Sequence, residues 1–483
     1  MTDLIRPPSE SDDYQAGTVA QSQRAVGLRK RTARSVRFAQ ALALVLAGYL
    51  LFDRAFAWIH VPGTPIFVGE VVLASGLYVA SRSKETRRFI RLSPPVQALV
   101  LFMAFGALLT VVGAMSYDPQ EAVRDAAIWY YGLFAVVIGT LAKAWEPAYD
   151  FFLRSYIRII PVFLVIGTFR VLFANRDNGI FMPDSQVLVT SHKPGNVGVQ
   201  AVMLIAFLLL VVAPELEHRD KVRNLTYTVG GLLLLALAGT QNRGVMVAGF
   251  IALFIVYIVG RASRPFIGSV LVVMIAALVL AFSFNLRFDL ERREVSVDQL
   301  FSNLISLSFD ANPRSINDDD GTIAWRIELW TLVIGDTLSA DRFLSGFGFG
   351  PNLAGKYGFV AGAVAGPELR NPHNSHLSVI ARMGVLGAAL WIALWAFWFR
   401  HLWKARKRFQ FVEEDQRSGF LAWCMVAAIT MLINGIFDPS LEGPQAAIWL
   451  WCIYGLGAFV AAEGNMVRWR PQAPASARTG RAS

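Results

Sequence analysis

Residues 96–115 have the sequence VQALVLFMAFGALLTVVGAM, a run of 20 residues without a charged side chain. A helix needs roughly 17–25 mostly apolar residues to cross the hydrocarbon core of a bilayer. Inside lipid, every backbone amide must be satisfied within its own segment, so a run of this kind forms a helix. Residues 96–115 therefore predict a membrane-spanning helix.

Eleven further apolar stretches bring the predicted total to about twelve membrane helices. They cover approximately residues 38–52, 66–80, 125–142, 157–174, 197–213, 225–240, 244–260, 266–284, 375–399, 419–435 and 445–463. The 483-residue chain is 55% hydrophobic and 17% charged, whereas a soluble domain is typically about 45–50% apolar and about 25% charged. The sequence thus predicts an all-α, polytopic membrane protein.

Basic residues are distributed unevenly between the short loops on the two sides of the predicted bundle. One set of loops carries 19 Lys and Arg residues, and the other set carries 5. Because Lys and Arg are concentrated on the cytoplasmic side of membrane proteins, this asymmetry places both termini in the cytoplasm. The net charge of +10 is explained by the same clusters, so it does not predict nucleic-acid binding.

The chain divides into tails, two groups of helices and one large outer loop. We predict a disordered cytoplasmic tail at 1–36, helices one to nine in 37–284, a periplasmic loop at 285–372, helices ten to twelve in 373–464, and a second cytoplasmic tail at 465–483. Within the loop, residues 322–338 predict a helix that begins after an acidic turn at 318–321 and lies on the membrane surface or caps the bundle. Its apolar residues at helical spacing are Ile323, Ile327, Trp330 and Ile334.

The densest polar cluster is Asn371-Pro372-His373-Asn374-Ser375-His376-Leu377, where the large loop meets the tenth helix. One interpretation is simply a helix start, since Pro suits the first turn and Asn or Ser can cap it. The other is functional: His373 and His376 lie over a cavity at the water boundary, where an imidazole can accept a proton or hold a hydroxyl. Two histidines at this spacing lack an evident third ligand, so we predict no metal site.

Four arginines are further candidates. Arg243 lies in a tight outer link, where it either snorkels to the interface or binds phosphate through its planar guanidinium. Arg326 lies beside the apolar face of the loop helix and either pairs with a nearby acid in solvent or joins the site. Arg170 and Arg382 fall inside apolar stretches, where a charged side chain usually faces a cavity or a partner.

Three local motifs together resemble the O-antigen ligase and polymerase superfamily of bacterial membrane glycosyltransferases. They are Asn242-Arg243-Gly244, Trp325-Arg326 with Trp330, and Pro372-His373-Asn374-Ser375 with Leu377, which continues as residues 380–387, IARMGVLG. The helix count and the large outer loop between helices nine and ten resemble the same family. His376 stands where relatives often carry an aromatic residue, so the acceptor site here differs from theirs.

The resemblance implies an O-antigen ligase-like enzyme of the bacterial inner membrane whose active site faces the periplasm. Its donor would be an undecaprenyl-diphosphate-linked glycan, and its acceptor a sugar hydroxyl on a glycan or on lipid A–core. We predict His373, Arg243 and Arg326 as catalytic residues. We predict that substrate is bound by Asn374, His376, Arg170 and Arg382, with no cofactor, no metal and no nucleic-acid partner.

Two alternatives remain open from the sequence. The first is an O-antigen or exopolysaccharide polymerase of the same family, which would differ only in its acceptor. The second is a secondary transporter or flippase for a polysaccharide or a lipid, because about twelve helices is also a common transporter count. A transporter places its polar site near the bilayer midplane, whereas a transferase of this kind should place it near the outer surface.

Overall fold

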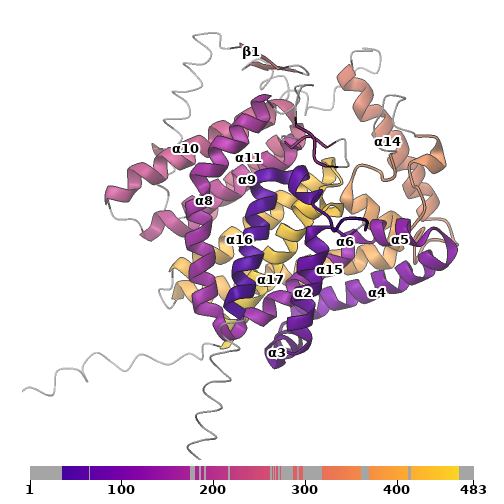
Figure 1. Ribbon diagram of the computed structural model, residues 1–483, viewed down its shortest axis with the longest axis horizontal. Coiled ribbons are helices and arrows are strands. Elements are labelled where there is room, and N and C mark those ends of the chain that lie inside the picture. The colour runs from indigo at the N-terminus through magenta and orange to yellow at the C-terminus, as the bar shows by residue number, and fades with distance from the viewer. Residues whose placement is uncertain are drawn as a thin grey trace, which may run out of the picture.

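The computed structural model describes residues 35–64, 66–173, 180–183, 187–189, 192–215, 218–260, 264, 266, 268–269, 272, 287–290, 293–296, 318–359, 369–411 and 415–466. Figure 1 shows them as a bundle in which helices distant in sequence lie side by side. Both predicted tails lie largely outside the described residues, as do the predicted helix 266–284 and most of the loop before residue 318.

Within the described residues, eight helices are long and apolar enough to cross a membrane. They are the first helix Ser35–Ala57, α4 (Pro94–Ser116), α8 (Trp145–Phe173), α9 (Pro194–Phe207) with its continuation to Val212, α10 (His218–Gln241), α15 (Ser375–Phe411), α16 (Asp415–Phe437) and α17 (Pro444–Met466). A ninth candidate is a bent pair, Pro119–Asp125 with Ala127–Leu141, whose halves meet at 45°.

These segments coincide with nine of the predicted stretches. Two more correspond to the shorter apolar helices α2 (Val68–Ser81) and α11 (Arg243–Val259). The remaining stretch is 266–284, which is mostly undescribed. The multi-pass helical architecture is therefore confirmed, and the count of twelve stays a prediction.

Further helices and turns connect the membrane-crossing helices. They are α3 (Lys84–Leu92), α5 (Pro119–Asp125), α6 (Ala127–Tyr130), α7 (Leu133–Val137), α14 (Asp318–Thr337), and the single turns or short segments Ile138–Ala144, Leu208–Val212, Ala213–Glu215, Gly355–Tyr357 and Ser440–Glu442. The predicted loop also contains an antiparallel ribbon of two strands, β1 (Arg287–Leu290) and β2 (Arg293–Ser296). This ribbon is a small addition to an otherwise all-α architecture among the described residues.

The middle of the bundle is formed by α9 and α17, because 89% of the residues in the 18-residue apolar segment of each helix are buried. Buried tryptophans tie neighbouring helices to this centre through backbone carbonyls. Trp423 Nε1 donates to the Met203 oxygen at 2.9 Å, and Trp398 Nε1 donates to the Tyr454 oxygen at 2.9 Å. An indole N–H that is buried without such an acceptor would be costly, so these bonds fix how the helices pack.

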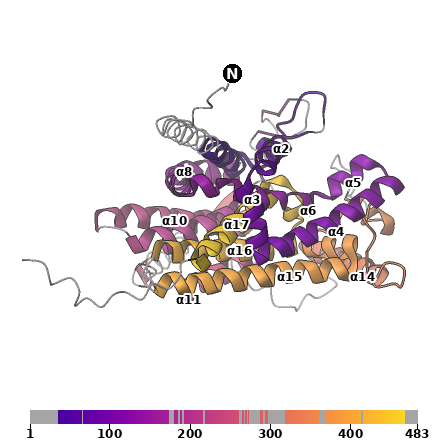
Figure 2. The ribbon, with the colours of Figure 1, turned by 90° about the horizontal axis from the view of Figure 1, so that it is seen from below.

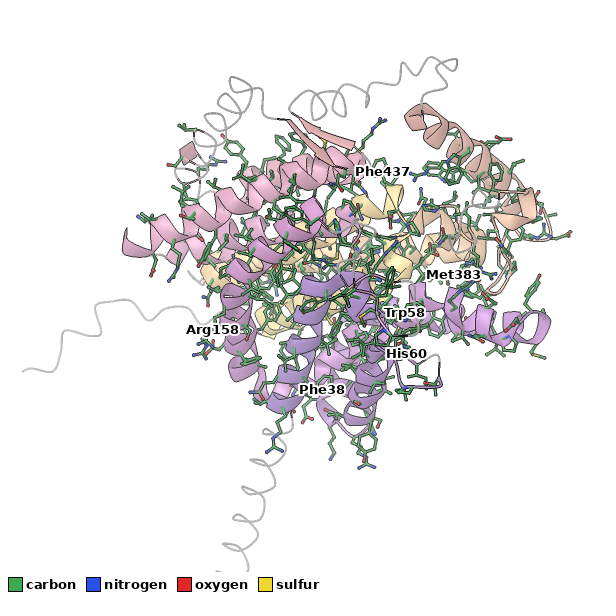
Figure 3. The ribbon with its side chains drawn as sticks, turned by 45° about the horizontal axis from the view of Figure 1, so that its top comes forward. Phe38, Trp58, His60, Arg158, Met383 and Phe437 are labelled. Carbon is green, nitrogen blue, oxygen red and sulfur yellow. The ribbon has the colours of Figure 1, made fainter. Side chains whose placement is uncertain are left out.

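The two ends of the bundle carry different kinds of residues. Ser35 Oγ donates to the Thr140 oxygen, and the ring of Phe89 lies 5.6 Å from that of Phe459, so the start of the first helix and the end of α17 meet near α3. Figure 3 shows Phe38, near the start of the first helix, and Phe437, at the end of α16, at opposite ends of the molecule. The polar residues described below gather around Phe437.

The loop helix α14 lies at the same end of the molecule as α5 (Figures 1 and 2). Its existence agrees with the prediction, but it begins at Asp318 and not after the acidic turn. The apolar residues of this helix divide between two faces. Leu329 and Val333 are fully buried against the core of this region, whereas Ile327 and Ile334 are 54% and 38% exposed.

The chain after α14 docks into a break in α15. Gly384 interrupts that helix with a φ of 63°, and a Cβ atom there would lie 2.5 Å from the Leu344 carbonyl. The nitrogens of Phe347 and Gly348 donate to the oxygens of Ala381 and Arg382, at 2.7 and 3.0 Å. The glycine-rich run 346–350 is therefore a docking strap that fastens the loop region to a membrane helix.

The orientation in the membrane can be measured with single cysteines. The natural Cys424 and Cys452 are buried, so they give little background. We expect a membrane-impermeant maleimide to label Ser339→Cys on spheroplasts with an intact inner membrane, and to label Ser81→Cys only after lysis. Both serines are exposed, and the positive-inside count puts them on opposite sides. The reverse labelling pattern would show that the orientation in the membrane is opposite to the predicted one.

Candidate active site

His373 lies in a turn whose backbone conformation is held by hydrogen bonds from neighbouring residues. Its φ of 54° is left-handed, a conformation that costs a non-glycine residue of order 1–3 kcal/mol. Asn371 Oδ1 accepts from the His373 nitrogen at 3.2 Å, and Trp330 Nε1 donates to the Pro372 oxygen at 2.7 Å. Asn374 then caps α15, because its Oδ1 accepts from the nitrogens of His376 and Leu377 at 3.0 Å each. Both sides of the strained residue are therefore held.

The surroundings of His373 favour a neutral imidazole. Burial lowers the pKa of His373 to about 4, and the positive charge of Arg326 acts in the same direction. Asp438 opposes this shift, while Lys193 adds to it weakly. The ring of Trp325 meets the imidazole edge to face, with centroids 5.8 Å apart. A neutral imidazole in a partly buried position can accept a proton at neutral pH.

Arg326 extends from α14 toward the end of α16. Its Nη1 donates to the Phe437 oxygen at 3.2 Å, and its guanidinium carbon lies 5.5 Å from the centre of the Trp325 ring. Its Nε is buried and has no hydrogen-bond partner among the described residues. A buried donor without a partner is costly, so this nitrogen is a natural contact for a bound anion.

A second charged pair lies beside these residues. Lys193 Nζ is 2.9 Å from Asp438 Oδ1, directly after Phe437 in the chain. Asp53 anchors the lysine, since its Oδ2 accepts from the Lys193 nitrogen at 2.8 Å. The sequence interpretation missed both members of the pair. In the sequence, each is a charged residue followed by proline and lies beside an apolar stretch. That pattern could have identified both as candidate site residues.

Arg243 is the first residue of α11, whose start is capped by Asn242 Oδ1 accepting from the Val245 nitrogen at 3.1 Å. The next residue, Gly244, packs so closely on Phe437 that a Cβ atom would lie 2.7 Å from the Phe437 Cβ. Phe437 is also the residue whose carbonyl binds Arg326. The structure thus brings His373 and Arg326 together and packs the start of α11 against the same end of α16.

Three of the predicted substrate-binding side chains are occupied within the fold. His376 Nε2 lies 2.8 Å from the Leu432 oxygen of α16, and its Nδ1 accepts from Trp391 Nε1 at 3.0 Å across the break within α15. Arg170 donates to the oxygens of Leu51 and Phe52 at 2.6 and 3.1 Å, where the first helix turns. These contacts favour structural roles, and substrate binding by His376 and Arg170 stays a prediction.

Arg382 is the third of these side chains. It is 1% exposed and lies 2.9 Å from Asp125 Oδ2, with further contacts to the carbonyls of Gly348 and Pro351 at 3.5 and 3.3 Å. It therefore fastens the docking strap and α5 to α15. Asn374, the fourth predicted ligand, uses its side-chain oxygen as the cap described above, so its role in shaping the turn is the one that its contacts support.

Glu442 is a further acidic group that the sequence interpretation missed. Asn371 Nδ2 donates to its Oε2 at 3.2 Å, which joins the turn after α16 to the turn that carries His373. Burial raises the pKa of Glu442 to about 7. Within the part of the chain that the structure describes, no cluster of three or more His, Cys, Asp or Glu side chains could hold a metal ion.

A segment that carries the three predicted catalytic residues matches a known protein family. Residues 228–392 match the family model described as O-antigen ligase, and this segment contains Arg243, Arg326 and His373. No curated protein matches the chain. Residues 228–392, about a third of the chain, are thus similar to the O-antigen ligase family.

Proposed function

We propose that this protein transfers a glycan from undecaprenyl diphosphate to a sugar hydroxyl, as an O-antigen ligase does. The observation that carries the proposal is the pairing of Arg326, which has a buried donor without a partner, with the neutral His373. A phosphate-binding cation and a proton acceptor are the two groups that such a transfer needs.

The proposed step forms one bond and breaks another. His373 accepts the proton of the acceptor hydroxyl while its oxygen forms a bond to the anomeric carbon of the donor glycan. The bond from that carbon to the phosphate oxygen breaks, and undecaprenyl diphosphate leaves with the electron pair. Arg326 and Arg243 donate hydrogen bonds to the developing charge, a role in which guanidinium groups can replace a metal ion.

The position of the site favours a transferase over a transporter. Arg243 begins α11, His373 precedes α15, Lys193 precedes α9 and Phe437 ends α16, so the polar groups lie at helix ends. With the topology predicted above, these ends face the periplasm of a bacterium across its inner membrane. Lipid-linked glycans could then enter sideways from the outer leaflet, where nucleotide sugars are absent.

The direct test is a transfer assay with purified protein in lipid nanodiscs, undecaprenyl-diphosphate-linked glycan and a lipid A–core acceptor. We expect glycosylated lipid A–core and free undecaprenyl diphosphate, with equal rates in EDTA and in magnesium. A product in which donor glycans are joined to each other would identify a polymerase. Abolition by EDTA with rescue by magnesium would refute the metal-free step. Absence of any released undecaprenyl diphosphate would refute the transferase itself.

The acid limb of the rate profile reports on His373. A base must be unprotonated, and the pKa of His373 in the free protein is about 4. Because kcat/KM reports groups of the free enzyme, we expect it to stay constant from neutral pH down to about pH 5 and to fall below that. A fall centred near 6.5, the ordinary value for histidine, would contradict the proposed environment. Size-exclusion profiles at each pH control for unfolding.

A further inference from the structure

A cleft with several charged side chains lies near the active site, between the end of α4, the start of α5 and the strap that follows α14. Its volume is about 460 Å³. Its lining is made of aromatic, acidic, amide and basic side chains together with the strap backbone. The side chains that matter here are Tyr117, Glu121, Arg342, Phe347, Asn352 and Arg370.

The cleft has a rigid floor. Arg370 Nη2 donates to the Gly350 oxygen at 2.8 Å and lies 3.0 Å from Glu121 Oε2 and 3.4 Å from Asp125 Oδ2. The Gly350 nitrogen in turn donates to Asp125 Oδ2 at 3.3 Å. A Cβ atom on Gly350 would lie 2.8 Å from the Cβ of Tyr117, so the strap presses directly against the end of α4. These contacts hold the lining residues in place before a ligand binds.

Two cations lie over the aromatic ring of Phe347 in this cleft. The guanidinium carbon of Arg342 is 4.6 Å from the ring centre, and Lys356 Nζ is 4.5 Å from it. The lysine is neutralised, because it bonds to Asp336. Among the described residues, Arg342 has no carboxylate within ion-pair distance. Asp336, which also feels the charge of Arg342, is already bonded to Lys356. A half-buried guanidinium held on a ring in this way can bind an anion by charge-assisted hydrogen bonds.

The cleft is close to the reacting groups. Arg370 lines it, and its backbone oxygen accepts from the nitrogen of Leu353, another lining residue, at 3.0 Å. His373 follows only three residues later, a stretch that spans at most about 11 Å when extended. A short saccharide could therefore reach from the cleft to the base.

We propose that this cleft is a subsite for an acidic saccharide, held a few sugar residues away from the bond that forms. Arg342 binds its carboxylate or phosphate group, while Glu121 and Asn352 bind hydroxyl groups and Tyr117 contributes an aromatic surface. The proposal rests on the proposed transfer function, because it places the subsite on the path of one of the two glycans. It concerns a saccharide of either the donor or the acceptor.

Binding can be tested without turnover. The full chain in nanodiscs is titrated calorimetrically with trigalacturonate as the acidic probe and maltotriose as the neutral one. We expect trigalacturonate to bind more tightly, and Arg342→Gln to weaken it about 10- to 100-fold, the loss expected for a hydrogen bond to a charged group. Arg342→Lys should retain part of the affinity, and maltotriose binding should not change.

A matched control is Arg82→Gln. Arg82 also lies over an aromatic ring, 4.2 Å from the centre of Tyr78, but at the end of α2 beside α3. This variant should bind trigalacturonate normally. Equal affinity for the two probes, absence of binding, or a loss in Arg82→Gln equal to that in Arg342→Gln would each overturn the proposal. His373→Ala should bind normally, which separates failure of the subsite from failure of the transferase. Competition by lipid-linked donor or by acceptor then identifies the glycan that occupies the cleft.

Discussion

Replacing Arg326 with lysine is expected to lower kcat by about 10²–10³-fold in the transfer assay. This is the usual penalty for the loss of one preorganised transition-state donor. Lysine keeps the charge but loses the fork of N–H groups, one of which binds the Phe437 oxygen at 3.2 Å while Nε stays buried without a partner. Because diphosphate charge grows as the glycosidic bond breaks, the KM for the donor should change less than kcat.

The matched control for this substitution is Arg154→Lys. Arg154 pairs with Asp150 one helical turn away on α8, and both side chains are mostly exposed, at 67% and 59%. Its replacement should leave kcat within about twofold, since surface pairs contribute little. If Arg326→Lys retained the full rate, Arg326 would be a structural link between α14 and α16, and the diphosphate would need another ligand.

The long helices could be predicted because lipid leaves the backbone few choices. A stretch such as 96–115 forms a helix whatever its neighbours do, and α4 covers it completely. The loop helix α14 is different, because it has apolar residues on more than one face. Ile327 and Ile334 are apolar residues at helical spacing, but Leu329 and Val333 are the residues that pack against the rest of the protein. Which face is buried depends on the strap, and local sequence does not reveal that.

The site was partly predictable for a related reason. His373 and Arg326 belong to short motifs, so their residue types and positions were informative. Arg170 and Arg382 were recognised correctly as buried charges, but a buried charge faces either a ligand or a protein partner. Their partners are carbonyls of the first helix and Asp125 of α5, which are remote in sequence. Lys193 and Asp438 were missed because a charged residue before proline, beside an apolar stretch, is a weak signal until the fold pairs the two side chains.

Arg382→Met is expected to lower the free energy of unfolding by about 3 kcal/mol. Arg382 and Asp125 are 1% and 7% exposed, and removing one partner of a buried pair typically costs about 3–5 kcal/mol because the other charge stays buried. The lower end applies here, since Arg370 still lies 3.4 Å from the same carboxylate. Unfolding in detergent by a denaturant titration measures the change. The strap should loosen as well, because Arg382 also contacts the carbonyls of Gly348 and Pro351.

Arg124→Met, on the same short helix as Asp125, is the matched control for Arg382→Met. Arg124 is paired with Glu121 but is 51% exposed, so its loss should cost less than about 1 kcal/mol. The double variant Arg382→Met with Asp125→Asn should lose less than the sum of the two single variants, because it leaves no uncompensated charge behind. Equal losses in Arg382→Met and Arg124→Met would mean that the buried pair does not hold the strap. The strap would then depend on its backbone bonds to Ala381 and Arg382, and Gly346→Ala, which pushes a Cβ atom to 2.3 Å from the Ala381 oxygen, would become the destabilising change.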